Sequence, residues 1–360
     1  MRILVLSHTR YKSHFKIGSH HYSNYLSDGN DVYFSGIPFT LFHRMLNKKD
    51  QGIDQLNNRV GKLKLHFFFP IKTKYCKWLI FINRLYFGFR KKNDLKFDLI
   101  LCDTPYFSPY IDLFNYDKLI YRPTDDYEAM DGIKVHKHEY NIIKKSDMIF
   151  PTSDSVSENL LTRYKDIALN KKMHTIPNGF DSRLFYCKSS RSERLGALYI
   201  GAIDSRFDFN ALSKLAANFP NCPFNIYGPL ESEYIDIASS LMNKHKNLVF
   251  HGAIKYEETP ALMNKHKVGL LLLEDNKANE GRSPMKLWEY YACGLDILYS
   301  TINIQDSYPG MYKYYNYDDM EKKFHKVISK NEEYVHDKKI FNHSWECKCN
   351  IIIDMVNGNF

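Results

Sequence analysis

The sequence has no run of eighteen apolar residues, so no segment of it is predicted to cross a membrane as a helix. The apolar run within its first ten residues, MRILVLSHTR, is too short for a secretory signal peptide. We therefore expect a cytoplasmic protein that meets the cell membrane only peripherally, at the inner face.

Cysteine is sparse and irregularly spaced. The chain has seven cysteines, an odd number, and the only close pair is Cys347 and Cys349. This spacing fits neither a disulfide framework nor a zinc site, because a zinc site needs a second pair of ligands. We expect reduced thiols in the cytosol and no bound metal.

Acidic residues are scarce in the first hundred positions. Residues 1–100 hold 18 Lys and Arg against 6 Asp and Glu, a net charge of +12, whereas the remaining 260 residues sum to −3. A composition of 44% apolar and 25% charged residues excludes a disordered chain. The excess of positive charge in residues 1–100 predicts an anionic partner for that part of the chain alone.

Short apolar runs alternate with longer helical patterns, which indicates βα units and parallel sheets. The expected strands are 2–6, 31–35, 98–102, 118–121, 147–151, 173–176, 197–201, 223–227, 248–251, 268–273 and 296–299. A polar stretch at 187–196 separates two series of them. We predict an α/β protein of two Rossmann-like, doubly wound domains, 1–185 and 186–340, with a ligand cleft between them. A terminal helix within 341–360 is expected to pack on the first domain.

Residues 61–96 combine ten Lys or Arg with nine aromatic residues and one Asp. Apolar residues recur at helical spacing from Tyr75 to Phe89, with Trp78 among them. Basic residues flank that face: Lys74, Lys77, Arg84, Arg90, Lys91 and Lys92. This pattern is typical of a helix that lies in the headgroup layer of an anionic membrane. A core helix with solvated basic residues, or a site for single-stranded nucleic acid, would give a similar pattern; no other nucleic-acid signature accompanies it.

Two stretches in the second half carry a phosphate-binding pattern. In LGALYIGAIDSRFDFNAL, a strand is followed by Gly201 and then by Arg206 before a helix, which offers free backbone N–H groups and a bidentate donor. In EGRSPMKLWEYYACGLDIL, Ser283 and the following proline resemble a helix cap and first turn. Lys286 and Glu289 then share one helix face, where they suit a diphosphate and the two hydroxyls of a ribose. An ordinary Lys–Glu salt bridge is the alternative.

Five segments in order resemble the nucleotide-sugar domain of GT-B glycosyltransferases, especially family four: IPNGFDSRLF, GAIDSRFD, IYGP, HGAIKYEETPALMNKHKVGLLLL and SPMKLWEYYACG. The opening GSHHYSNYL is similar to the first loop and helix of the acceptor domain, as in membrane-associated glucuronosyltransferases of the xanthan type. The resemblance implies two Rossmann-like domains and sugar transfer from a nucleotide donor, without a metal or other cofactor.

Carried over by position, the resemblance implies that Glu289 binds the donor ribose and that Lys286, Ser283 and Arg206 contact the diphosphate. Gly201, Gly228 and Met285 complete the implied donor site. The chain departs from family four at one point. The first carboxylate of the usual glutamate pair would fall at position 281, which is a glycine, and Glu280 stands one place earlier. This departure leaves open whether the transfer inverts or retains the anomeric configuration.

On the acceptor side, Asp125 and Asp126 follow a predicted strand, and either could act as a general base. A helix cap with a solvated neighbour is the structural alternative. His20 and His21, in the loop that starts at Gly18 and Ser19, are the rival bases or acceptor ligands. We expect this loop to line the ligand cleft, with only one of the two histidines reaching it.

Together these patterns predict transfer of a hexose or uronic acid from a UDP-sugar to a lipid-linked saccharide at an anionic membrane, in bacterial surface or exopolysaccharide synthesis. A UDP-sugar 2-epimerase of similar fold would use the same nucleotide site but would need no membrane surface. A non-catalytic sugar-nucleotide-binding protein is the other alternative. No nucleic-acid partner is expected.

Overall fold

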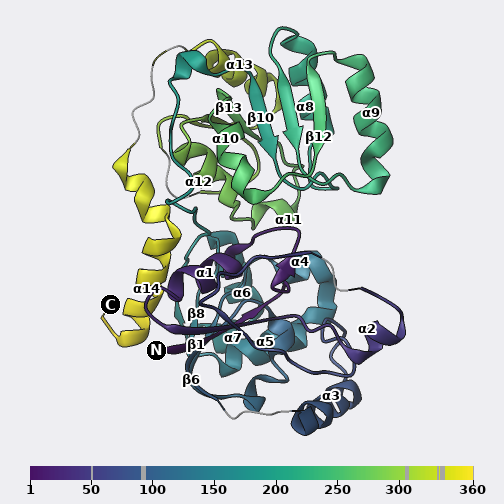
Figure 1. Ribbon diagram of the computed structural model, residues 1–360, viewed down its shortest axis with the longest axis vertical. Helices are drawn as coiled ribbons and strands as arrows, with labels where there is room; N and C mark the ends of the chain where they lie inside the picture. The colour runs from purple at the N-terminus through teal and green to yellow at the C-terminus, as the bar shows by residue number, and fades with distance from the viewer. Residues whose placement is uncertain (50–51, 91–94, 305–307, 331, 333–336, 360) are drawn as a thin grey trace. The chain divides into compact units, whose positions relative to one another are not determined.

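The computed structural model describes residues 1–49, 52–90, 95–304, 308–330, 332 and 337–359. The chain divides into two compact units. The first unit holds Met1–Pro177, Gly281–Ser283 and Lys348–Phe360, and the second holds Asn178–Glu280 and Pro284–Cys347. Each unit contains its own parallel sheet with helices on both sides (Figure 1).

The first unit has a seven-stranded parallel sheet in the order β5-β3-β1-β6-β7-β8-β9. Its strands are β1 (Arg2–Ser7), β3 (Asp31–Gly36), β5 (Gly61–Lys62), β6 (Lys96–Cys102), β7 (Asn115–Tyr121), β8 (Met148–Ile149) and β9 (Lys172–Met173). A separate antiparallel pair joins β2 (Lys12–Ser13) to β4 (Ile53–Asp54). The central strands are apolar and covered on both faces, as parallel sheets require.

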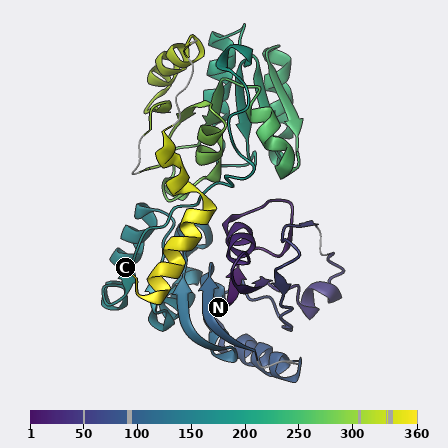
Figure 2. The ribbon, with the colours of Figure 1, turned by 60° about the vertical axis from the view of Figure 1, so that its left-hand side comes forward.

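The helices of the first unit are α1 (Gly18–Leu26), α2 (Leu41–Met45), α3 (Lys77–Arg90), α4 (Tyr127–Asp131), α5 (His136–Lys145), α6 (Asp154–Arg163) and α7 (Lys165–Ala168). The terminal helix α14 (Trp345–Asn357) belongs to this unit from Lys348 onward. Figure 2 shows α14 in yellow alongside the strands, where the Lys118 ammonium donates a hydrogen bond to the Val356 carbonyl.

The second unit has a six-stranded parallel sheet in the order β12-β11-β10-β13-β14-β15. The strands are β10 (Ala197–Ile200), β11 (Phe224–Tyr227), β12 (Leu248–Gly252), β13 (Val268–Leu271), β14 (Asp296–Tyr299) and β15 (Met311–Lys313). Its helices are α8 (Phe209–Asn218), α9 (Ile235–Lys244), α10 (Thr259–Met263), α11 (Lys277–Glu280), α12 (Met285–Ala292) and α13 (Tyr317–Ile328). One apolar core lies under α8 and α13, and another lies under α10 and α12.

The expected fold class is confirmed, because both sheets are parallel and doubly wound. Each expected strand coincides with an observed one, although β8 and β9 are only two residues long. Four observed strands were not predicted. β2, β4 and β5 are only two residues long, and the residues of β15, Met311–Lys313, are all only partly buried and so lack an apolar run.

Candidate functional site

In the second unit, α12 places two charged side chains at the carboxyl edge of the sheet. A helix that connects two parallel strands begins at that edge, so residues in its first turn face a ligand site. The helix is fixed by Tyr290, whose ring lies where a side chain on Gly269 would be. The Tyr290 hydroxyl also accepts a hydrogen bond of 2.7 Å from the Ile200 amide. The position of the first turn is thereby set by close packing.

Lys286 and Glu289 form an ion pair one turn apart on α12. The Tyr256 hydroxyl donates a hydrogen bond of 3.1 Å to Glu289 Oε1, and the Lys286 ammonium lies 5.3 Å from the centre of the Tyr256 ring. Phe185 provides a second aromatic ring, 5.9 Å from that ammonium. Helical spacing predicts that Lys286 and Glu289 both lie on an exposed helix face. This prediction is wrong for Glu289, because its side chain is completely buried.

The predicted cap of α12 is also wrong. The N-cap residue is Pro284, and it makes no side-chain cap hydrogen bond; Met285 is the first helical residue. Ser283 groups with the first unit, whereas Lys286 and Glu289 group with the second. A role for Ser283 and Met285 in diphosphate binding stays a prediction.

The loops after β10 and β11 meet at two glycines. Gly228 has a φ of +140°, and a Cβ atom there would lie 1.7 Å from the carbonyl oxygen of Gly201. Only glycine permits this approach. Beyond Gly201, the Arg206 side chain forms an ion pair with Asp204. The predicted second diphosphate cation is therefore already paired with a carboxylate, which a donor phosphate would have to displace or share.

In the first unit, the carboxyl edge of the sheet brings together residues from three strand ends. Asp103 follows β6 and forms a fully buried ion pair with Arg122, which follows β7; Nη2 and Oδ2 are 2.8 Å apart. His8 follows β1. Burial lowers the pKa of His8, and the nearby carboxylates of Asp103 and Asp125 oppose that shift. His8 is not among the predicted site residues, although a polar residue directly after the first buried strand is itself a signal.

Asp125 and Asp126 have different surroundings. Asp126 is the N-cap of α4 and accepts hydrogen bonds from two amides of the first turn. It also accepts from Asn159 at 2.8 Å and pairs with Arg163 at 2.5 Å. Asp125 is partly exposed and makes no hydrogen bond or ion pair within the described residues. Of the two predicted bases, Asp125 is thus the one whose carboxylate is available to a substrate.

The two adjacent histidines are both fully buried in α1. His20 Nδ1 accepts a hydrogen bond from the Ile17 amide, and Nε2 lies 2.9 Å from the Arg10 carbonyl oxygen. Burial lowers the pKa of His20 to about 4. His20 thus stabilises the start of the helix, and its ring nitrogens are engaged within the unit. A catalytic role for His20 or His21 stays a prediction.

The loop expected at Gly18 to His21 is wrong in its secondary structure, because these residues form the first turn of α1. Ile17 is the N-cap residue, without a side-chain cap hydrogen bond. Ser19 instead lies inside the helix, where its hydroxyl is 2.6 Å from that of Ser7. Gly18 and Ser19 are both buried within the unit, so their expected contact with an acceptor stays a prediction.

Helix α3 has two opposite apolar faces. One face packs on the unit through Phe87 and the completely buried Asn83. The other face is exposed, with Trp78 64% and Phe89 86% accessible. Phe81 and Leu85 lie between them on the exposed face. The alternative prediction, a core helix, is wrong for this face, because its apolar side chains are exposed.

The basic residues around α3 fall into three groups. Lys74 and Lys77 are exposed. Arg84 turns towards its own unit, where Nη1 donates a hydrogen bond of 2.7 Å to the Pro109 carbonyl. Its expected place at the membrane surface is therefore less favoured. The side chain of Arg90, and Lys91 and Lys92 entirely, lie outside the described residues.

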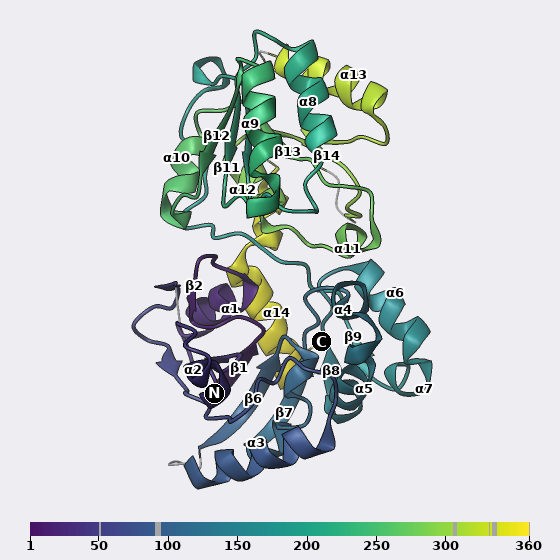
Figure 3. The same cartoon turned by 90° about the vertical axis from the view of Figure 1, so that its right-hand side faces the viewer.

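The exposed apolar face continues onto α2, which the sequence analysis did not include. Phe69 links the two helices: its ring centre lies 5.9 Å from that of Phe42 and 6.2 Å from that of Trp78. Met45, on α2, is 66% exposed. We call the following set the apolar patch: Phe42, Met45, Leu46, Phe69, Trp78, Phe81, Leu85 and Phe89. The two helices are labelled at the outside of the first unit in Figures 1 and 3.

Within the described residues, no group of three or more His, Cys, Asp or Glu is arranged to hold a metal ion. No helix there combines the length and apolarity of a membrane span.

Comparison with known proteins identifies the architecture. Residues 209–338 match a family model described as glycosyl transferase-like. The whole chain superposes on sucrose-phosphate synthase (tll1590) from Thermosynechococcus elongatus with a TM-score of 0.67 and 14% identity, covering 100% of this chain and 99% of that one. Anabaena Alr3699/HepE in complex with UDP gives a TM-score of 0.67 and 12% identity, covering 99% and 100%. The chain has the GT-B fold of glycosyltransferases.

One curated relative of this GT-B protein is TuaH of Bacillus subtilis (strain 168), which bears the name of a teichuronic acid biosynthesis glycosyltransferase. The two sequences are 25% identical over 227 residues, or 56% of this chain. The aligned region spans about half of TuaH, 55% of its length. The family match at 209–338 contains α12, so the Lys286–Glu289 pair lies inside the glycosyl transferase-like part of this GT-B protein.

Proposed function

We propose that this protein is a glycosyltransferase that moves a hexose or uronic acid from a UDP-sugar to a lipid-linked saccharide, in the synthesis of a bacterial surface polysaccharide. The observation that carries the proposal is the Lys286–Glu289 pair at the start of α12, within the glycosyl transferase-like region. The name of TuaH supports the polysaccharide class, and the UDP complex of Alr3699/HepE supports the nucleotide.

For the donor, Lys286 supplies a positive charge to the diphosphate, and Glu289 accepts hydrogen bonds from the ribose hydroxyls. The ion pair holds both groups ready before a donor arrives, and Tyr256 fixes the buried carboxylate. As the bond to the sugar breaks, negative charge grows on the leaving diphosphate. Lys286 stabilises that charge together with Arg206, in place of a metal ion.

For the acceptor, Asp125 acts as the general base. It takes the proton of the attacking hydroxyl while the hydroxyl oxygen forms a bond to the anomeric carbon. The bond from that carbon to the diphosphate oxygen breaks in the same displacement, and the nucleoside diphosphate leaves. The Asp125 carboxylate lies close enough to His8 to oppose the lowering of the His8 pKa, which makes His8 the second candidate for this proton.

A lipid-linked acceptor requires the enzyme to work at a membrane surface. The apolar patch supplies exposed aromatic side chains, and the exposed basic residues Arg44, Lys48, Lys49, Lys74 and Lys77 accompany it. No acidic residue occurs in 41–49 or 72–90. This combination suits insertion into the interface of an anionic bilayer.

The test is a transfer assay with separate donor and acceptor arms. The protein is incubated with UDP-glucose, UDP-galactose or UDP-glucuronic acid and with undecaprenyl-diphosphate-linked saccharides. Mass spectrometry measures the masses of the products. We expect the acceptor to gain one sugar residue with release of UDP. Inversion at C2 of the donor without transfer would instead support the epimerase. Absence of both UDP binding and turnover would overturn the proposal.

A further inference from the structure

The turn between β7 and α4, residues 122–127, is fixed at its β7 end by a buried ion pair. The Arg122 guanidinium donates to both carboxylate oxygens of Asp103, from Nε at 2.9 Å and from Nη2 at 2.8 Å. Both side chains are completely buried. The Tyr22 ring covers the guanidinium, with its centre 4.7 Å from Cζ. A bidentate pair of this kind fixes the orientation of Arg122 as well as its position.

Thr152 holds the middle of the turn from the segment that follows β8. Its amide donates a hydrogen bond of 3.2 Å to the Pro123 carbonyl, and its hydroxyl donates one of 2.9 Å to the Thr124 carbonyl. Thr152 is itself completely buried. The two residues that precede Asp125 are therefore tied to the sheet through their backbone.

Tyr127 holds the far end of the turn. Its hydroxyl donates a hydrogen bond of 2.5 Å to the Asp103 carbonyl. Because the phenol has one proton, the Thr124 hydroxyl is the donor in its 3.2 Å contact with Tyr127. Asp103 thus binds both ends of the turn, Arg122 through its carboxylate and Tyr127 through its backbone.

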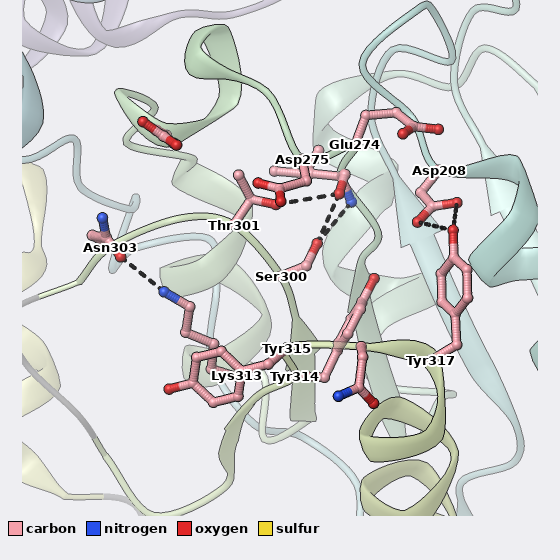
Figure 4. A pocket seen from close by; sticks show the side chains of 13 residues that line it. Asp208, Glu274, Asp275, Ser300, Thr301, Asn303, Lys313, Tyr314, Tyr315 and Tyr317 are labelled. Carbon is pink, nitrogen blue, oxygen red and sulfur yellow. Dashed lines mark hydrogen bonds between the residues drawn. The ribbon is translucent and has the colours of Figure 1, made fainter.

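Other tyrosines of this chain that lie beside a carboxylate bond to the carboxylate itself. The Tyr164 hydroxyl donates to Glu139 at 3.1 Å. In a pocket of about 450 Å³ in the second unit, the Tyr317 hydroxyl contacts both oxygens of Asp208, at 3.4 and 3.3 Å (Figure 4). Such a contact occupies the acceptor positions of the carboxylate and leaves it less able to take a proton from a substrate.

Tyr127 is different, although a carboxylate lies near it. Burial raises the pKa of Tyr127 well above its usual value, and the charge of the nearby Asp125 carboxylate adds to this shift. The hydroxyl nevertheless donates to the Asp103 carbonyl. Asp125 makes no hydrogen bond or ion pair within the part of the chain that the structure describes. Tyr127 therefore fixes the backbone around Asp125 without occupying its carboxylate.

We propose that Tyr127 is a positioning residue for Asp125: through Asp103, its hydroxyl holds the turn so that the free carboxylate meets the acceptor hydroxyl. This inference rests on the proposed function, in which Asp125 takes the proton of that hydroxyl. A base that is fixed before the substrate arrives needs no ordering at the moment of reaction, and a small displacement of it costs rate. Tyr127 itself does not touch the reacting atoms.

The first experiment compares Tyr127→Phe with Tyr164→Phe. Both side chains are 5% exposed in the same unit and each variant loses one hydroxyl, but Tyr164 donates to Glu139 and not to the turn. Hydrogen exchange of the Thr152 amide reports on the turn, because this amide donates to the Pro123 carbonyl. We expect exchange on the order of tenfold faster than in the parent for Tyr127→Phe, and at the parental rate for Tyr164→Phe.

The second experiment measures transfer, with the donor and acceptor that the transfer assay identifies. Tyr127→Phe should lower kcat on the order of tenfold to a hundredfold, while the donor KM and the UDP affinity are retained. Tyr164→Phe should leave all three unchanged. Thr124→Val, which removes the donor to the Tyr127 hydroxyl, should lower kcat in the same direction. It replaces Tyr127→Phe if that variant unfolds at the assay temperature.

A double variant separates positioning from a merely structural role. Because Tyr127 acts through Asp125, adding Tyr127→Phe to Asp125→Asn should cause no further loss of kcat. A general loss of structure would instead multiply the two losses.

Three results would overturn the inference: parental exchange of the Thr152 amide in Tyr127→Phe, parental kcat in Tyr127→Phe while Asp125→Asn is impaired, or losses that multiply in the double variant. Failure of the proposed function gives different results. If the parent transfers no sugar, the exchange of Thr152 still decides whether Tyr127 holds the turn. Parental turnover in Asp125→Asn would remove the proposed base, and this inference with it.

Discussion

The Tyr256 hydroxyl donates a hydrogen bond to the buried carboxylate of Glu289, from a segment about thirty residues earlier in the chain. This contact leaves one carboxylate oxygen to Lys286, so the ion pair and the aromatic contact hold the same side chain from two directions. Changes at either charged residue therefore affect both ligand binding and the packing of α12.

The first prediction concerns UDP affinity. Glu289→Gln keeps an acceptor for Tyr256 but loses its charge, and Lys286→Met keeps the stem but loses the ammonium. Each should weaken UDP binding by roughly 1.5–3 kcal/mol, the range for a charge-assisted hydrogen bond. Isothermal titration calorimetry measures this loss, with Lys244→Met on α9 as the matched surface control. Unchanged UDP affinity in both variants would remove α12 from the donor site.

The second prediction separates the two aspartates. Asp125→Asn should lower turnover by about 10²–10⁴, the usual contribution of a general base, while UDP affinity is retained. Asp126→Asn preserves a capping oxygen but breaks the pair with Arg163, so it should lower the unfolding midpoint more than Asp125→Asn does. If His8→Gln abolishes turnover and Asp125→Asn does not, the base is His8.

The third prediction concerns the membrane surface. The triple variant Trp78→Gln, Phe81→Gln and Phe89→Gln should lose binding to anionic vesicles, because these side chains are exposed in the unit. Lys74→Gln with Lys77→Gln should weaken binding roughly tenfold or more, at about 1 kcal/mol per charge. Lys244→Gln with Lys246→Gln is the charge-matched control. Vesicle sedimentation that is equal for all variants would exclude the apolar patch from membrane contact.

The fourth prediction concerns the pH dependence of stability. Burial raises the pKa of Glu139 to about 7, although the hydroxyls of Tyr121 and Tyr164 donate hydrogen bonds to it. Between its ordinary pKa near 4.5 and this value, the folded state holds more protons than the unfolded state. The contribution of Glu139 to the unfolding free energy therefore falls as pH rises through this window.

Glu139→Gln removes this contribution. Its amide oxygen still accepts from one tyrosine hydroxyl, and its NH2 group can donate to the hydroxyl of the other. Urea unfolding at a series of pH values measures the free energy of unfolding of the parent and of this variant. The difference between these two free energies should change by on the order of 3 kcal/mol from pH 4.5 to pH 8. The depressed pKa of His20 gives a slope of opposite sign in both proteins, so it cancels in the difference. Parallel curves for the two proteins would contradict the shifted pKa of Glu139.

The sequence predicts most strands of this fold for a simple physical reason. The central strands of a parallel sheet are covered on both faces, so β1 and β14 appear as uninterrupted apolar runs. The edge strands β5 and β15 have no such requirement, and their exposed or partly buried residues are not visible in the pattern. Residues 281–283 and 348–360 belong to the first unit although they lie far along the chain from the rest of it. Their place depends on contacts between distant segments, and a local sequence pattern carries no information about such contacts.

The candidate site is only partly predictable for the same reason. Spacing alone pairs Lys286 with Glu289 on one helix face, but the burial of Glu289 depends on Tyr256 from a distant segment. Sequence adjacency made Asp125 and Asp126 equivalent candidates. Arg163, on α6, distinguishes them by binding only the second.

Asn83 determines how the apolar patch would meet a membrane. Its side chain accepts hydrogen bonds from the amides of Phe68 and Phe69 and donates one each to the Phe69 carbonyl and the Tyr110 hydroxyl. The loop that carries Phe69 is thereby tied to α3 before any lipid is present. Insertion would consequently require little ordering of this loop, and the patch would enter the interface as a preformed wedge rather than as a segment that folds upon contact.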